Sequence, residues 1–141
     1  MSTMDALVQL SFQIQRILSE VGAEHDLSIV QIRMLGVLRD RQPAMLELGQ
    51  HLGLDKSSTT GLVSRAEKRG LVQRSPSPYD GRGVLVALTE QGREVVQWGE
   101  AEIGRRIAEL TGPLSDAERD RLTELAARLV RDVRPGYPIY R

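Results

Sequence analysis

The side chains best suited to chemistry in this sequence lie between residues 56 and 82, and they are cations and hydrogen-bond donors. This segment contains six basic and two acidic side chains, in a chain whose formal net charge is zero. Phosphate binding responds to the local field within about 8–10 Å, so the segment is a candidate nucleic-acid surface. A solvated charged face is the alternative reading of the charge alone. The polar and basic positions nearest its start are Lys56, Ser57, Ser58, Thr60 and Arg65.

Those residue types match the needs of DNA recognition. Lysine neutralises phosphates, whereas serine, threonine and arginine bond to phosphates or to base edges. If residues 56–69 form a helix, its first turn also presents backbone N–H groups and the positive end of the helix dipole. Arg65 then lies one to two turns further along the same outward side.

A second group of charged residues surrounds a segment rich in proline and glycine. We expect Arg82 at the tip of a hairpin loop, where it can enter a narrow minor groove. Asp80 would orient Arg82 or Arg74, and Arg74 is itself a candidate DNA contact. Gly83 and the glycine before Arg82 permit a tight bend and close backbone approach.

Other chemistry has little support. The chain has no cysteine and two histidines, which argues against disulfides, thiolate nucleophiles and a structural zinc site. No glycine-rich loop opens a helix after a strand, and neither histidine has a serine and carboxylate arrangement. We therefore expect no enzyme, cofactor or metal. We interpret His25 and His51 as structural, and Trp98 as packing in the dimer core or at a hinge, or as a ring that stacks on a ligand.

The elements that position these residues follow from periodicity. A short helix over 44–52 ends at Gly53, Asp55 caps the next helix over 56–69, and strands follow over 71–74 and 84–88. This order is that of a winged helix-turn-helix. The inward stripe of the second helix is Thr59, Leu62, Val63 and Ala66.

Further helices flank this unit. The first covers residues 4–24, a second begins at Ser28, Thr89 caps a long helix that Gly112 and Pro113 end, and Ser115 opens the last one. The apolar stripes of the first and last helices are too broad for one chain to bury, so we expect them to pair with a second subunit. The dimerisation residues predicted in this way are Leu7, Leu10, Ile14, Leu122, Leu125, Leu129 and Val133.

The expected fold class is mainly α with a small β-hairpin wing. We divide the 141 residues into a dimerisation helix (1–27), a winged helix-turn-helix domain (28–92), and dimerisation helices with a non-helical tail (93–141). An apolar content of 40% and a charged content of 27% are ordinary for a folded domain. No apolar run approaches the roughly 18 residues that span a bilayer, so we expect a cytoplasmic protein without membrane contact.

The segment from Leu54 to Arg74, followed by Asp80-Gly81-Arg82-Gly83 and by Leu88-Thr89-x-x-Gly92, resembles the signature of MarR-type regulators. The resemblance implies a homodimer that reads a near-palindromic site in double-stranded DNA. It implies groove contacts for Ser57, Ser58, Thr60 and Arg65, and a wing tip formed by Asp80 and Arg82. Gly61 departs from the family pattern, in which a larger polar residue is common, so we expect one base contact fewer.

The resemblance also suggests how such a protein acts. Many members repress transcription and leave DNA when a small anionic or phenolic molecule binds between the dimerisation and DNA-binding parts. No residue for such a ligand is identified from the sequence. The alternative hypothesis is a winged-helix module that docks a partner protein and does not bind DNA.

Overall fold

The computed structural model describes residues 1–78 and 83–131, which form six helices and one hairpin. Asp80, Arg82, Val133 and the tail 134–141 lie outside the described residues. The elements, in chain order, are α1 (Thr3–Ala23), α2 (Ile29–Asp40), α3 (Met45–Leu52), α4 (Lys56–Lys68), β1 (Val72–Pro76), β2 (Val84–Leu88), α5 (Glu90–Leu110) and α6 (Asp116–Arg131). The predicted fold class is confirmed.

Side-chain caps fix where the helices begin. The Ser28 hydroxyl accepts from the Gln31 N–H at 3.3 Å, and the Gln31 amide oxygen accepts from the Ser28 N–H at 2.9 Å. Ser115 and Glu118 make the same reciprocal pair before α6. Each pair is a capping box that satisfies N–H groups without a partner in their helix, so the helix starts predicted at Ser28 and Ser115 are confirmed.

The hairpin differs from the prediction at one end. The sequence predicts a first strand over 71–74, but β1 extends to Pro76, which pairs with Val84. Proline is tolerated there because a two-stranded sheet has edges where no N–H is needed, and the Ser77 N–H continues the pairing to the Gly83 carbonyl at 2.8 Å. The sheet also gains a short third member, which the sequence did not suggest: Ala44 forms a bridge with Leu85.

The core lies between α2, α3, α4 and the hairpin. Its largest fully buried side chains include Met34 of α2, Leu48 of α3, Leu62 of α4, and Val72 and Val86 of the two strands. Each element presents one apolar face to this core, as the periodicity predicts.

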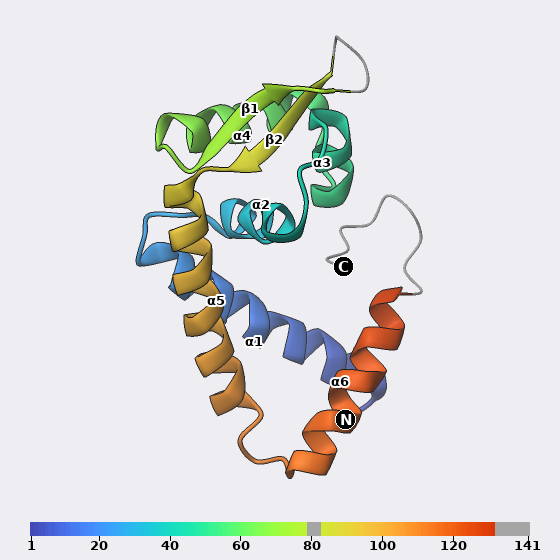
Figure 1. Cartoon of the computed structure of the whole chain (residues 1–141). Helices are drawn as coiled ribbons and strands as arrows, with labels where there is room; N and C mark the ends of the chain where they lie inside the picture. The colour runs from blue at the N-terminus through green and yellow to red at the C-terminus, as the bar shows by residue number, and fades with distance from the viewer. Residues whose placement is uncertain (79–82, 132–141) are drawn as a thin grey trace.

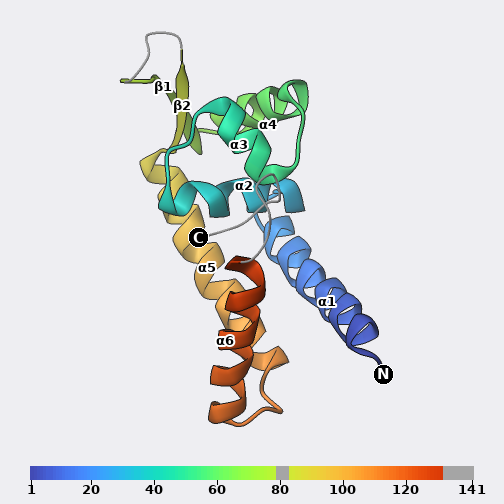
Figure 2. The same cartoon turned by 90° about the vertical axis from the view of Figure 1, so that its right-hand side faces the viewer.

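Figure 1 shows how the remaining helices extend away from this body. The helix α5 starts at the hairpin, passes α2 and packs against α1. The helix α6 buries none of its residues and stands apart from α5 in Figure 1 and from α1 in Figure 2. Within residues 1–78 and 83–131, no helix is long and apolar enough to cross a membrane.

A threonine and a glycine lock the start of α5 onto the hairpin. The Thr89 hydroxyl donates to the Gly70 carbonyl at 2.5 Å and accepts from the Gly92 N–H at 3.0 Å. A Cβ atom at Gly92 would lie 2.0 Å from the Leu71 carbonyl oxygen, so only glycine fits there. The Leu88-Thr89-x-x-Gly92 motif is therefore a packing motif.

Replacement of Gly92 by alanine should lower the free energy of unfolding by about 2–4 kcal/mol, because the backbone of residue 71 would have to move. Gly99→Ala is the matched control in the same helix, since no atom beyond the neighbouring residues and backbone of its own helix lies within 4 Å of its Cβ position. Alanine there should raise stability by about 0.5–1 kcal/mol. Urea unfolding of both variants measures the difference, and similar effects at the two sites would contradict this account.

Candidate nucleic-acid interface

The helix α4 is buried along one face and exposed along the other. Gly53 ends α3 in the left-handed conformation, with φ of 68°, and this turn directs α4 away from α3. All four predicted inward residues are buried, including Thr59, whose hydroxyl donates to the Asp55 carbonyl at 2.8 Å. The packed face fixes the orientation of the outward face.

Asp55 caps α4 as predicted. Its carboxylate accepts from the Ser58 N–H at 2.7 Å, and this hydrogen bond holds the pKa of Asp55 below its ordinary value. The carboxylate therefore occupies one N–H group that the sequence had left available to a phosphate, and places a negative charge at the positive end of the dipole. The side chains of the first turn, more than its amide groups, are the part of α4 available to an anion.

The exposed face of α4 carries the predicted polar and basic residues. Lys56, Ser57, Ser58 and Arg65 are exposed, and the half-buried Thr60 donates to the Lys56 carbonyl at 2.8 Å. In the part of the chain that the structure describes, neither Lys56 nor Arg65 has an ion-pair partner. Both charges are thus available to an external anion.

Gly61 gains a physical role in this arrangement. A Cβ atom at position 61 would lie 3.3 Å from Nη1 of Arg65. The missing side chain therefore leaves room for the guanidinium to lie back along α4. The departure from the family pattern changes where Arg65 can reach, besides removing one side chain.

Arg74 lies close to α4, but its guanidinium is engaged. Its Nε lies 3.3 Å from a carboxylate oxygen of Glu67, and its Nη2 donates to the Ser64 hydroxyl at 2.7 Å. Sequence reasoning proposed Asp80 as a partner of Arg74 or Arg82 and missed Glu67 and Ser64. Their spacing of three on the outward side of α4 was the available signal. Arg74 thus ties β1 to α4, and Asp80 and Arg82 lie outside the described residues.

Several arginines outside α4 are neutralised by carboxylates. Arg106 of α5 lies within 2.9 Å of Glu20 and 2.8 Å of Glu24 on α1, and Arg105 bonds Glu102 and Glu109. The bond from Arg105 lowers the pKa of Glu102. Lys56 and Arg65 of α4 differ in this respect from Arg105 and Arg106.

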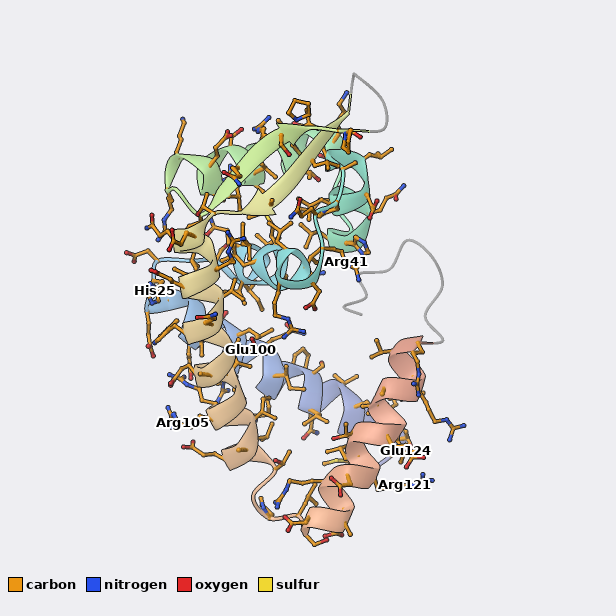
Figure 3. The ribbon with its side chains drawn as sticks, in the orientation of Figure 1. His25, Arg41, Glu100, Arg105, Arg121 and Glu124 are labelled. Carbon is orange, nitrogen blue, oxygen red and sulfur yellow. The ribbon has the colours of Figure 1, made fainter. Side chains whose placement is uncertain are left out.

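A cavity of about 360 Å³ lies between α2 and α5. Its wall is mostly apolar, and its charged members are Arg39 and Glu100, which pair at 3.1 Å. Figure 3 shows Glu100 on the part of α5 that faces α2. Arg39 also holds Asp40, and this hydrogen bond lowers the pKa of Asp40. Trp98, for which stacking on a ligand was one of the two interpretations, lines this cavity.

The predicted dimerisation residues lie on two exposed apolar faces. Leu7 of α1 and Leu122, Leu125 and Leu129 of α6 are exposed, whereas Leu10 and Ile14 are half-buried. Phe12, which widens the α1 stripe, is 62% exposed. These faces have no cover among residues 1–78 and 83–131.

Comparison with known proteins identifies similar chains. The profile of the MarR family matches residues 25–83. The HTH-type transcriptional repressor NicR of Pseudomonas putida is 33% identical over 116 residues, which cover 81% of this chain and 73% of NicR. The uncharacterised HTH-type transcriptional regulator YdgJ of Bacillus subtilis is 25% identical, over 89% of this chain and 79% of that protein.

Solved structures agree with this comparison. The wild-type apo form of MarR from E. coli is 27% identical, with a TM-score of 0.77 over 92% of this chain and 97% of that one. A mutant of E. coli MarR complexed with operator DNA is 28% identical, with a TM-score of 0.71 over 89% and 91% of the two chains.

The Asp55 cap gives a testable dependence on pH. Because folding lowers the pKa of Asp55, its stabilising effect is complete above the ordinary pKa, about 3.9, and is lost as the pH falls through the lowered value. Asp55→Ala should lower the melting temperature by a few degrees at neutral pH, and its deficit should shrink in acid.

Asp55→Asn is the matched control, because asparagine caps a helix without a titratable group. It should keep most of the stability at neutral pH. Melting followed by circular dichroism from about pH 3 to pH 7 measures both variants. A deficit of Asp55→Ala that stays constant over this range would contradict the assigned cap.

Proposed function

The chain belongs to the MarR family, and from this premise we propose that it is a sequence-specific transcriptional regulator that binds double-stranded DNA as a homodimer. The observation that carries the proposal is the polar and basic outer face of α4 on a winged helix-turn-helix body, where Lys56 and Arg65 have no ion-pair partner among the described residues. The complex of a similar chain with operator DNA supports the choice of ligand.

In this proposal α4 is the recognition helix and enters the major groove. Ser57, Ser58 and Thr60 are small enough to approach the groove floor, and Arg65 bonds a base edge or the flanking phosphate. Lys56 neutralises a phosphate. Arg74 contributes mainly by fixing β1 to the recognition helix, and the wing tip with Arg82 reaches the adjacent minor groove.

We propose that the second copy of the chain covers the apolar faces of α1 and α6. The helix α6 buries nothing within its own chain, so its stripe of leucines needs a partner in water. Two-fold symmetry would then place two recognition helices about 34 Å apart, in successive major grooves of a near-palindromic site.

We assign repression as the mode of action, because the similar NicR is a repressor. The cavity between α2 and α5 is the proposed effector site, since it joins a helix of the DNA-binding body to a helix that reaches the dimerisation region. An apolar ring would pack against the apolar wall of this cavity, and an anionic or phenolic group would compete with Glu100 for Arg39. Such a ligand would favour a spacing of the two recognition helices that does not fit successive major grooves of DNA.

The second hypothesis, a winged-helix module that docks only proteins, lacks a supporting observation. A protein interface is depleted of charge at its centre, whereas the outer face of α4 is polar and carries free cations. We also propose that the protein is not an enzyme and binds no cofactor, and that it is located in the cytoplasm.

Arg65→Ala should weaken binding to a selected duplex by about 1–3 kcal/mol, because it removes a groove contact. Arg105→Ala removes the same charge from the far side of the molecule and should leave affinity nearly unchanged. Fluorescence anisotropy with duplexes selected from a random pool measures both. Wild-type affinity should also fall steeply with salt, since each neutralised phosphate releases counterions. No binding at low salt would refute DNA recognition.

Sedimentation should give twice the mass of one chain, and Leu125→Glu should shift it to a single-chain mass, because a charge would enter the proposed interface. Leu46→Glu is the matched control: Leu46 is 72% exposed but lies on α3, outside both apolar faces. It should remain dimeric. A wild-type protein that sediments as one chain at micromolar concentration would contradict the proposed homodimer.

A further inference from the structure

Arg69 joins the end of the recognition helix to the turn between α1 and α2. It follows the last residue of α4, and its two Nη atoms donate to two consecutive backbone carbonyls. Nη1 lies 2.8 Å from the Asp26 oxygen and Nη2 lies 2.5 Å from the His25 oxygen. In the described chain α1 and α4 share no extensive packing surface. The two hydrogen bonds from the Arg69 guanidinium, called the Arg69 fork below, are therefore a direct link between these helices.

The turn that Arg69 holds is itself well defined. The Leu27 N–H bonds the Gly22 carbonyl at 2.8 Å, and the Asp26 N–H bonds the Ala23 carbonyl at 3.2 Å. This pattern ends a helix with one left-handed residue, here Asp26 with φ of 54°. The arginine charge also lies at the negative end of the α1 dipole. Two fixed hydrogen bonds to such a turn transmit displacement better than contacts to a loose loop would.

The same turn touches the wall of the cavity. The His25 ring packs edge-on against Trp98 of α5, with ring centroids 4.2 Å apart and an interplanar angle of 64°. Figure 3 shows His25 at the end of α1, beside α5. Trp98 lines the cavity between α2 and α5. One residue, His25, therefore contacts the cavity wall with its ring and Arg69 with its backbone.

We propose that Arg69 is a positioning residue that couples the recognition helix to the cavity wall through the backbone of His25 and Asp26 and the ring contact between His25 and Trp98. The inference rests on the proposed DNA-binding function of α4. It adds a defined route by which DNA binding at α4 and the position of α5 at the cavity wall influence each other. Such coupling is reciprocal, so DNA bound at α4 must also alter the surroundings of Trp98.

The chain offers its own reporter, because Trp98 is the only tryptophan. It lies on α5, away from the outer face of α4, so a change in its emission on DNA binding reports transmission through the protein. The experiment titrates the whole chain with a duplex selected from a random pool and follows Trp98 fluorescence and duplex affinity together. Discrimination between the selected duplex and a random one is measured in parallel.

Arg69→Gln should abolish most of the Trp98 response and lower discrimination about fivefold or more. Lys68→Gln is the matched control, because it removes one charge from the neighbouring residue and leaves the fork intact. It should weaken binding to both duplexes alike and keep the Trp98 response. Arg69→Lys keeps the charge and can form one of the two hydrogen bonds, so it should restore part of the response. If Arg69→Gln fails to fold, the comparison of Arg69→Lys with wild type decides.

His25→Ala tests the second half of the route. It keeps the carbonyl that Arg69 binds and removes the ring that touches Trp98, so the fluorescence response should be lost with little change in duplex affinity. An unchanged response in Arg69→Gln or in His25→Ala would overturn the proposal. Wild-type binding without any Trp98 response would also overturn it, and would leave DNA recognition intact. Absence of duplex binding would instead refute the proposed function itself.

Discussion

The burial of one face of α4 is the constraint on which the rest of the structure depends. Thr59, Leu62, Val63 and Ala66 contact the core with at most 1% of their surface exposed, so α4 can neither rotate nor slide without exposing apolar area. The Gly53 turn and the Asp55 cap then fix the start of α4, and the Arg74 contacts fix its flank. The helix α4 therefore presents one defined polar face to the exterior.

Ion pairing neutralises some of the cations of this chain and leaves others without a carboxylate partner. Arg105 and Arg106 are surrounded by carboxylates that join α5 to α1, whereas Lys56 and Arg65 lack such partners in the described residues. Exposed ion pairs contribute little to stability on average, but they cancel the field of their members. Their main consequence here is to cancel the fields of Arg105 and Arg106, whereas the fields of Lys56 and Arg65 are not cancelled in this way.

Periodicity and capping patterns predicted most of the fold, because Ser28, Asp55, Thr89 and Ser115 each mark a helix start by local hydrogen bonding. Contacts between distant segments could not be predicted in this way. The bridge of Ala44 to Leu85 depends on tertiary packing, and the partners of Arg74 and Arg69 depend on which surfaces the core brings together. The exposed residues of the candidate site, its buried stripe and its Asp55 cap were predictable, whereas the long-range contacts of Arg74 and Arg69 were not.

A formal charge of zero has a consequence for recognition. Since residues 56–82 carry a net positive charge, the other residues carry an equal net negative charge, and beyond a Debye length salt screens both fields. Such a chain gains little long-range attraction to DNA of arbitrary sequence. Its binding free energy must come from contacts made once α4 is seated, where the groove geometry decides which contacts form. Discrimination then depends strongly on the orientation of the recognition helix, and therefore on the residues that hold its two ends.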